Sequence, residues 1–548
     1  MDEHMKQIDL SGLSFSELMR QDKYYVDKTL LIKDLLSTND RGVFLFTRPR
    51  RFGKTTNLSM LDAFFNIEYK GNDWFDGLLI SKYPEYDSYK NSFPVIHLDM
   101  RASKKGTYDG FVYGMKCVIS WAFNEHRYLL ESDIPDDYFR RLHDRIVNRE
   151  ATDEELRDSL LLLSKTLEEY HGRKVIILID EYDCAVADSF GQESHRPMLD
   201  FLRDFLGLTL KGNSSLQMAY MTGVMQIAKE SLFSDLNNIS VNNILSEMSD
   251  ERFGFTESEV RDILSYYGRP EKFDEAREWY DGYRFGDAEV YNPFSIMTYV
   301  QNGFKPDTYW VNSGSQNIIR TLLEHVNNTN LATISNILTG SAAAAHIETS
   351  LAFGDLYGSD ESLLGLMATA GYLNAVPRDD GLFDISIPNK EIWKIVDDTF
   401  RRMNPVDPGD FARFNGYLIS GDAEIMASEL EGILQDESYL TLRNEYVYQA
   451  ILVTILHQMR ERYEIRAEYE AGNGRADIFL RPLSPPLPWI IMELKVVKSE
   501  GMLDKGLDEA MDQIRDRRYS MGLSGKTLLV GMSFFKKVPK VRSEIIDS

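Results

Sequence analysis

The sequence predicts an α/β protein with a parallel sheet in its N-terminal half and a second α/β domain at its C-terminal end. In the first 245 residues, short apolar runs at 42–47, 93–99, 175–180 and 216–224 alternate with longer helical segments, as in parallel βαβ units. Near the C-terminus the predicted order is helix, three strands, helix and strand. These elements span 443–460, 463–470, 475–481, 489–497, 503–519 and 526–533.

Between these halves the chain is predicted to be mostly helical and is rich in aromatic residues. The segment MNPVDPGD at 403–410 contains two prolines and a glycine and is typical of a linker. We therefore predict three parts: 1–245 with the parallel sheet, 246–402 as a helical lid or extension, and 403–548. The last part holds the linker, a helical segment and the second α/β domain.

Composition excludes several classes of protein. Of the 548 residues, 43% are hydrophobic and 27% are charged, as in a soluble globular protein. No apolar run approaches the roughly 18 residues of a membrane span, and the N-terminus lacks the features of a signal peptide. Two cysteines and nine scattered histidines do not suggest a disulfide framework or a zinc site. We expect a cytoplasmic protein with no membrane partner.

The net charge of −25 disfavours a nucleic-acid partner, but the acidic residues are not evenly spread. Residues 441–548 contain 17 Lys and Arg against 15 Asp and Glu, so the C-terminal domain is not the acidic part. A nucleic acid therefore remains a plausible partner for that domain.

The first motif is a phosphate-binding loop between the strand at 42–47 and the following helix. Gly53, Lys54 and Thr55 offer a helix N-terminus, an ammonium group for the phosphates and a hydroxyl for Mg²⁺. The position of the usual first glycine holds an arginine, and the next residue, a proline, can set the turn instead. The predicted ATP-binding residues are Arg48, Pro49, Arg50, Arg51, Phe52, Gly53, Lys54, Thr55 and Thr56, the arginines adding positive charge. The alternative is a basic surface loop.

The apolar strand VIILID ends in two adjacent carboxylates. Asp180 is placed to hold Mg²⁺, and Glu181 is placed to orient or deprotonate the water that attacks the nucleotide. The alternative, a solvated turn, is weakened by the phosphate loop. Together the two motifs predict ATP hydrolysis.

The third motif lies in the C-terminal domain, where the proline-rich loop 482–488 joins two strands. A hairpin centred on residue 485 places Asp477 opposite Glu493, and Lys495 shares their face because side chains two apart on a strand do so. Facing carboxylates repel each other unless a cation lies between them, which predicts Mg²⁺ or Mn²⁺. The ammonium group would stabilise charge on a phosphate. The alternative is a structural ion pair between Glu493 and Lys495.

Two further residues are candidates for this site. Glu445, on the preceding helix, is a possible third carboxylate ligand, and Gln513, on the following helix, is placed to steady the water or the lysine. For Glu470 and Arg475, contact with the metal, with DNA or with each other is left open.

These motifs, taken with four others, resemble a known family. RPRRFGKT (48–55), IDEYD (179–183), TGVMQIAKESLFSDLNNI (222–239), WYDGY (279–283), YNPFS (291–295) and IPNKE (387–391) are similar to the bacterial AAA-ATPase-like proteins with a C-terminal PD-(D/E)xK nuclease-like domain. The resemblance covers nearly the whole chain. It implies a P-loop NTPase parallel sheet with a helical extension, followed by a PD-(D/E)xK nuclease-like α/β domain.

The resemblance also assigns positions. It makes the arginine at the first-glycine position a family trait and matches Asp477, Glu493 and Lys495 to the three defining residues of the nuclease motif, with Ala476 in place of its proline. Where many relatives have an arginine that can sense the γ-phosphate, this chain has Gln226. Thr222 is either a sensor of the nucleotide or a core residue.

Two surfaces remain open to interpretation. The aromatic motifs near Arg284 suggest either base stacking or, more simply, packing of the helical part onto the sheet. A set of basic residues near the C-terminus would contact either phosphates or only solvent. This set comprises Arg515, Arg517, Arg518, Lys536, Lys537, Lys540 and Arg542.

Together these observations predict an ATP-binding and ATP-hydrolysing protein coupled to a Mg²⁺-dependent nuclease domain that acts on nucleic acid, with DNA favoured. The competing prediction is a nucleotide-controlled regulatory protein whose nuclease-like domain binds a partner without cutting it. A structural protein with a non-functional phosphate loop is a third alternative. Self-association through the ATPase domain is left open.

Overall fold

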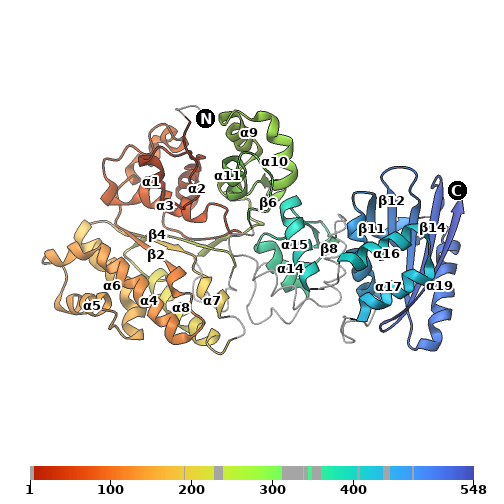
Figure 1. Cartoon of the computed structure of the whole chain (residues 1–548). Helices are drawn as coiled ribbons and strands as arrows, with labels where there is room; N and C mark the ends of the chain where they lie inside the picture. The colour runs from red at the N-terminus through yellow and green to blue at the C-terminus, as the bar shows by residue number, and fades with distance from the viewer. Residues whose placement is uncertain are drawn as a thin grey trace. The chain divides into compact units, whose positions relative to one another are not determined.

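A computed structural model describes the chain at residues 5–189, 192–226, 239–310, 337, 343–348, 360–403, 408–435, 445–471 and 474–547 (Figure 1). The chain divides into two compact units. The first holds residues 1–313, 347–376 and 388–391, and the second holds 314–346, 377–387 and 392–548. The predicted helical part thus has residues in both units, and the three-part division stays a prediction.

A five-stranded sheet with the order β2-β3-β4-β1-β5 forms the centre of the first unit. All neighbouring strands run parallel, which confirms the predicted parallel sheet. Every residue of β1 and β3 is buried, as expected for strands covered on both faces. The sequence did not predict the short β5. The strands are β1 (Val43–Thr47), β2 (Val95–Asp99), β3 (Val175–Asp180), β4 (Leu216–Gly223) and β5 (Ile239–Asn242).

Helices lie on both faces of this sheet, with α1, α2 and α3 on one side and α4, α6 and α8 on the other (Figure 1). The longest, α6, begins at a capping box formed by Thr152 and Glu155, and its buried leucines recur three or four positions apart. This spacing makes the apolar stripe that packs against α4 and α8. The helices are α1 (Phe15–Arg20), α2 (Leu30–Asn39), α3 (Lys54–Phe65), α4 (Tyr108–Glu125), α5 (Asp137–Val147), α6 (Asp153–His171), α7 (Cys184–Asp188) and α8 (His195–Leu210).

Residues 253–310 add a cluster of short helices and a two-stranded antiparallel ribbon to the same unit. Their aromatic residues form a core of their own, which includes Phe255, Tyr280, Tyr291 and Tyr299. The described part of this segment is largely helical, as predicted. The elements are α9 (Glu257–Tyr266), α10 (Phe273–Tyr280), β6 (Tyr283–Phe285), β7 (Ala288–Val290) and α11 (Pro293–Gln301), and later α14 (Asp360–Thr369) and β9 (Asn374–Pro377).

The second unit is built on a five-stranded sheet with the order β11-β12-β13-β14-β15. Its neighbours are antiparallel except β13 and β14, which are parallel and joined by a helical crossover. The predicted helix, three strands, helix and strand all occur, and β15 is an added edge strand. The elements are α18 (Glu445–Leu456), β11 (Tyr463–Ala471), β12 (Gly474–Pro482), β13 (Trp489–Val496), α19 (Leu503–Asp516), β14 (Lys526–Phe535) and β15 (Val538–Asp547).

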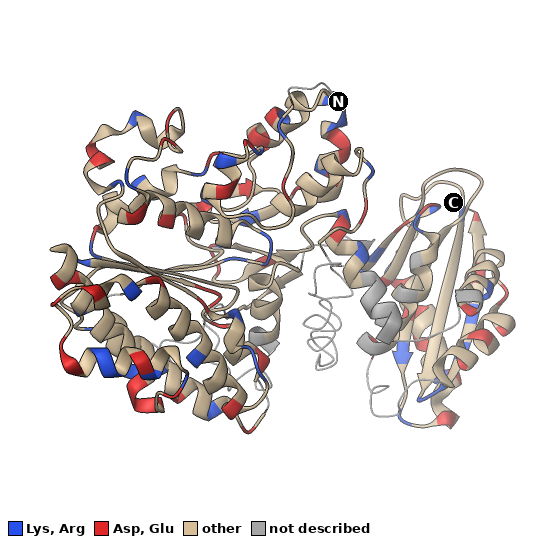
Figure 2. Ribbon diagram, turned by 60° about the vertical axis from the view of Figure 1, so that its left-hand side comes forward, with Lys and Arg blue, Asp and Glu red and all other residues tan. Residues whose placement is uncertain are grey.

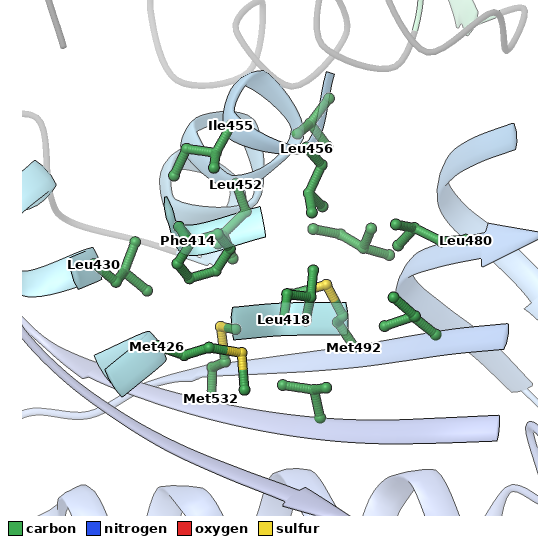
Figure 3. Packing of buried hydrophobic residues seen from close by; sticks show 14 of the residues in the cluster. Phe414, Leu418, Met426, Leu430, Leu452, Ile455, Leu456, Leu480, Met492 and Met532 are labelled. Atoms are coloured by element: carbon green, nitrogen blue, oxygen red, sulfur yellow. The ribbon is translucent and has the colours of Figure 1, made fainter. Parts of the chain in front are cut away.

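Apolar side chains cover both faces of this sheet. On one face, helices α16, α17 and α18 direct residues such as Phe414, Met426 and Leu452 toward Leu480, Met492 and Met532 on the strands (Figure 3). On the other face, α19 packs against Phe479 and Ile491. The remaining elements are α16 (Pro408–Ser420), α17 (Ala423–Gln435), α15 (Lys390–Met403), and the antiparallel pair β8 (Ala343–Ala345) and β10 (Phe383–Ser386).

Within the described residues, no helix is both long enough and apolar enough to cross a membrane.

Candidate functional site

The phosphate loop lies where β1 ends and α3 begins, at the carboxyl edge of the parallel sheet. Gly53 precedes the first helical residue with φ 79°, in the left-handed region that favours glycine. No atom lies within 4 Å of the position of an added Cβ, so the backbone angle is what requires glycine here. The first backbone N–H groups of α3 therefore open toward the loop, as an anion site needs.

Lys54 and Thr55 take the positions that the sequence predicts. The buried Nζ of Lys54 donates to the backbone carbonyls of Arg48 and Pro49, both at 3.0 Å, and so closes the loop upon itself. The hydroxyl of Thr55 donates to Oδ2 of Asp180 at 2.7 Å. The structure thus brings the loop and the carboxylate of β3 together as a hydroxyl–carboxylate pair, a donor set that suits Mg²⁺.

The second oxygen of Asp180 accepts a hydrogen bond from Thr222 on β4. β4 lies between β1 and β3, so this threonine stands between the phosphate loop and the carboxylates. Asp180 is 1% exposed, while Glu181 is partly exposed and has φ 53°. Because a glutamate rarely adopts a left-handed backbone, the sharp turn after β3 is a point of strain, as functional sites often show. Thr222 is therefore a contact of the site and not only a core residue.

Arg48 departs from the predicted role of its side chain. The guanidinium is fully buried; Nη1 donates to the carbonyls of Thr47 and Asn242, and Nη2 donates to Oδ1 of Asn242 at 2.6 Å. It also lies over the rings of Phe253 and Phe285, at 4.9 and 5.1 Å. Burial lowers its pKa to about 9. Since this side chain is fixed in the interior, it anchors the loop to β5 and does not extend toward a bound phosphate.

The following loop residues pack against the helical part of the same unit. Pro49 is buried beside Gly371, where an added Cβ would come within 2.7 Å of the proline ring. The carbonyl of Arg50 accepts from Nε1 of Trp310 at 3.1 Å, and the guanidinium of Arg51 lies 4.5 Å from the ring centre of Phe294.

Phe52 is buried beside two other aromatic rings. Its ring meets those of Tyr283 and Phe285 in edge-on contacts. Thr56 lies partly buried in the first turn of α3. The aromatic motifs at 279–283 and 291–295 thus support the phosphate loop from the side. These contacts support packing over base stacking as the role of the aromatic residues.

The segment at 387–391 completes this support. Glu391 is fully buried; one oxygen accepts from the hydroxyl of Ser295 and the other from the backbone N–H of Trp310, both at 2.8 Å. Asn389 donates to the carbonyl of Asp281 at 2.9 Å. Because Trp310 in turn bonds the loop at Arg50, the motif at 387–391 is tied to the phosphate loop through one intermediate residue.

The segment after β4 is described only as far as residue 226. Oε1 of Gln226 accepts from Nδ2 of Asn243 at 3.3 Å, so its amide is bonded beside β5. The remainder of the family motif at 222–239 lies outside the described residues up to residue 238.

The second predicted site is on the sheet of the second unit. β12 and β13 pair with the predicted register, with Ile478 opposite Met492 and Leu480 opposite Ile490. The same register sets Asp477 opposite Glu493. Alternation along the strands puts these two residues and Lys495 on one face, that of Phe479 and Ile491, which α19 covers. The three residues therefore share a face as the sequence predicts.

Glu493 is the buried centre of this group. Its Oε1 is 3.1 Å from Nζ of Lys495, and its Oε2 has no hydrogen-bond partner among the described residues. Burial and then the charge of Asp477 raise the pKa of Glu493 to about 7. Burial opposes the charge of Lys495, but Glu493 and Glu445 outweigh it and raise the pKa of this lysine. Lys495 is therefore a stable cation at neutral pH.

Asp477 and Glu445 reach the same edge of β13. Oδ2 of Asp477 accepts from the backbone N–H of Leu494 at 2.7 Å, and Oε1 of Glu445 accepts from that of Val496 at 3.4 Å. Gln449, which the sequence analysis missed, donates to the carbonyl of Asp477 at 2.7 Å. Its position four residues after Glu445, on the same face of α18, was the available signal.

Gln513 lies on α19 and bonds a tyrosine. Its Nε2 donates to the hydroxyl of Tyr519 at 3.3 Å, and this hydroxyl donates to the carbonyl of Arg475 at 2.7 Å. Burial raises the pKa of Tyr519, and the charges of Glu493 and Asp477 contribute. Tyr519 is therefore a neighbour of the carboxylates that the sequence did not reveal. Backbone pairing sets Glu470 opposite Arg475.

A divalent ion fits the donor chemistry of this group. A fully buried carboxylate oxygen of Glu493 that lacks a partner among the described residues is costly unless a cation or proton binds it. No cluster of three or more Asp, Glu, His or Cys side chains with metal-binding geometry occurs in the part of the chain that is described. The site is thus a facing pair of carboxylates, with Glu445 as a further candidate.

Three of the seven basic residues near the C-terminus are paired with acids. Nη2 of Arg515 contacts Glu544 at 2.5 Å, Arg542 contacts Asp508 at 2.7 Å, and Lys540 contacts Asp504. Each of these ion pairs joins a residue of β15 to a residue of α19. Figure 2 shows basic and acidic residues interspersed on both units. This pairing favours a solvated face over a phosphate-binding one. For the other four residues, contact with phosphates stays a prediction; these are Arg517, Arg518, Lys536 and Lys537.

Comparison with known proteins matches both halves of the chain. Residues 11–233 match a family model described as predicted AAA-ATPase, and residues 443–537 match the PD-(D/E)XK nuclease superfamily. The chain is 26% identical over 567 residues to an uncharacterized protein in the vnfD 5′ region of Azotobacter chroococcum mcd 1, with 99% of each chain covered. The structure of Drosophila ORC bound to AT-rich DNA and Cdc6 gives a TM-score of 0.18 at 9% identity, covering 71% of this chain and 91% of that one.

Proposed function

We propose that this chain, which joins an AAA-ATPase-like segment to a C-terminal PD-(D/E)xK nuclease-like segment, hydrolyses ATP in its first unit and cleaves phosphodiester bonds of nucleic acid in its second. The nucleotide state of the first unit would gate or position cleavage by the second. DNA is the favoured substrate, and the cytoplasm is the favoured location.

In the first unit, each polar group of the site has a role in ATP hydrolysis. The ammonium group of Lys54 exchanges its two loop carbonyls for phosphate oxygens, and the N–H groups at the start of α3 bind the phosphates. Thr55 and Asp180 would hold Mg²⁺, which neutralises phosphate charge when it is bound. Glu181, on the strained turn after β3, orients the attacking water and takes its proton.

In the second unit, the chain's own residues bind and orient the scissile phosphate. Asp477 and Glu493 would hold Mg²⁺ or Mn²⁺, which when bound polarises the phosphate and lowers the pKa of the attacking water. Lys495 stays protonated beside Glu493 and stabilises the negative charge that develops on the phosphate. Gln513, through Tyr519, positions the backbone at Arg475 beside this group.

The observation that supports cleavage most directly is the buried oxygen of Glu493 that lacks a partner among the described residues. A purely structural ion pair would be expected to satisfy both carboxylate oxygens. A binding cation explains why this carboxylate remains beside a second one.

The test is a cleavage assay with Mg²⁺ or Mn²⁺, with and without ATP, on single- and double-stranded DNA and RNA. We expect D477A and K495A each to lower the cleavage rate by about 100-fold or more. K505A is the matched control, because Lys505 is an exposed lysine paired with Glu509 on α19. A second readout is thermal unfolding. Mg²⁺ added to metal-free protein should raise the midpoint temperature of the wild type but not that of D477A.

The competing function is a nucleotide-controlled regulator that binds a partner without cutting it. Two observations favour it: the carboxylates already bond backbone N–H groups and Lys495, and the net charge is −25. This function predicts nucleotide binding with no cleavage of any substrate and no thermal shift with Mg²⁺. Cleavage that persists in both D477A and K495A would instead contradict the assigned nuclease site.

A further inference from the structure

An arginine that the sequence motifs do not single out lies beside the ATP site. Arg101 is in a 3-10 turn, η4 (Met100–Ser103), directly after β2. β2 and β3 are parallel neighbours, and Asp99 is paired in register with Asp180. Since neighbouring strands lie about 4.8 Å apart, this turn borders the strand end that carries Asp180 and Glu181.

Asp99 holds the guanidinium of Arg101 in a forked arrangement. Nε lies 2.9 Å from each carboxylate oxygen and Nη2 lies 2.5 Å from Oδ2, while the backbone N–H of Arg101 donates to Oδ1 at 3.0 Å. The bond to Asp99 raises the pKa of Arg101, burial opposes this rise, and the charges of Asp180 and Glu181 add to it. The guanidinium is therefore near both carboxylates of the predicted hydrolytic site.

The arginine is also free to change partners. Its side chain is 64% exposed, so it can leave Asp99 without disturbing the core. A guanidinium fork fits phosphate oxygens as well as carboxylate oxygens. Gln226, in the segment after β4, is neutral and bonded to Asn243. A guanidinium for the γ-phosphate, in addition to the ammonium group of Lys54, would then have to come from another part of the chain or from another molecule.

We infer that Arg101 is the arginine of this site: when ATP binds, its guanidinium moves from Asp99 to the γ-phosphate and stabilises the charge that develops there during hydrolysis. This inference rests on the proposed ATP hydrolysis. In that reaction a water oxygen bonds to the γ-phosphorus, the bond to the bridging oxygen breaks, ADP leaves, and the proton of the water passes to Glu181. The alternative is that Arg101 only neutralises Asp99, which would otherwise repel Asp180.

Single-turnover hydrolysis and nucleotide binding of the full chain separate these roles. We expect R101A to slow hydrolysis by about 100-fold while its ADP affinity stays within about threefold of wild type. R101K should be intermediate, since it keeps the charge and loses the fork. The matched control is R145A. Arg145 lies on helix α5 and is paired with Glu155 at the start of α6. This variant should hydrolyse ATP as the wild type does.

The double variant D99N/R101A distinguishes charge neutralisation from phosphate contact. If Arg101 acts on the phosphate, the double variant is as slow as R101A. If it hydrolyses ATP at the wild-type rate, Arg101 only neutralises Asp99 and the inference is wrong. R101A with wild-type kinetics would overturn it as well.

Binding measurements keep the inference testable if the wild type does not hydrolyse ATP. In that case the proposed hydrolysis fails, but contact between Arg101 and the γ-phosphate still predicts that R101A loses about tenfold in affinity for ATP and little for ADP. An unchanged ratio of ATP to ADP affinity would overturn the contact. A wild type that binds neither nucleotide would overturn the inference and the proposed function together.

Discussion

Arg48 shows how a single residue can replace the glycine of a phosphate loop. A glycine there would supply backbone freedom, whereas the arginine supplies a buried anchor that fixes the loop to β5 and to two aromatic rings. The sequence predicted the loop because Gly53, Lys54 and Thr55 are local in the chain. It could not predict the direction of the arginine, because Asn242 lies 194 residues further along.

We expect R48A to destabilise the protein by about 2–4 kcal/mol, because it empties a buried site and leaves polar groups of Asn242 without a donor. Nucleotide affinity should fall as well, since the loop loses its anchor. The matched control is R51A on the same loop, where the side chain is exposed and contacts Phe294; its effect should stay below about 1 kcal/mol. Thermal unfolding of the intact chain, with and without ATP, measures both. Equal shifts for the two variants would contradict the anchoring role.

At the scale of elements, the hairpin of β12 and β13 was the most predictable part of the second unit. Both strands are long and their loop is short, so a hairpin centred on residue 485 predicted the register that the structure has. Short or irregular elements were not predictable: β5 has four residues, and β15 lies at an edge with mostly half-buried residues and no regular alternation. Tyr519 and Arg101 were missed because only tertiary packing brings them to the carboxylates.

The buried Glu391 connects three segments: α11, the segment at Trp310 and the start of α15. Burial raises its pKa to about 7, although the N–H of Trp310 and the hydroxyl of Ser295 oppose the rise. The folded state therefore keeps this proton to higher pH than the unfolded state does. Its contribution to stability is fully present below the ordinary glutamate pKa and is lost as the pH rises through about 7.

We therefore expect the free energy of unfolding of the wild type to fall relative to that of E391Q as the pH rises from 5 to 8, by an amount on the order of 3 kcal/mol, as measured by denaturant unfolding at each pH. The neutral amide cannot ionise, so it lacks this dependence. E278Q is the matched control, because Glu278 is an exposed carboxylate paired with Lys390 nearby. A wild-type minus E391Q difference that stays constant with pH would show that Glu391 does not titrate in this range.

At the scale of the whole molecule, local motifs predicted two candidate sites, one in each unit, and the coupling between them stays a prediction. The phosphate loop contacts the helical part through Arg48, Phe52 and Trp310, so a nucleotide that shifts the loop also acts on these contacts. The helical part supplies residues to both compact units. This chain connectivity offers a route by which nucleotide binding can reach the second unit.

A reciprocal pair of variants tests this coupling. We expect K54A to lose ATP binding and, with it, the effect of ATP on cleavage, leaving one cleavage rate with or without nucleotide. D477A should lose cleavage but still bind ATP, and if the sites are coupled its hydrolysis should no longer respond to nucleic acid.

The matched control is K174A, a lysine of the first unit outside the phosphate loop. Cleavage that responds to ATP in K54A as in the wild type would show that the nucleotide acts elsewhere. If each activity proceeds at its own rate whatever the state of the other, the proposed gating of cleavage by the nucleotide is wrong.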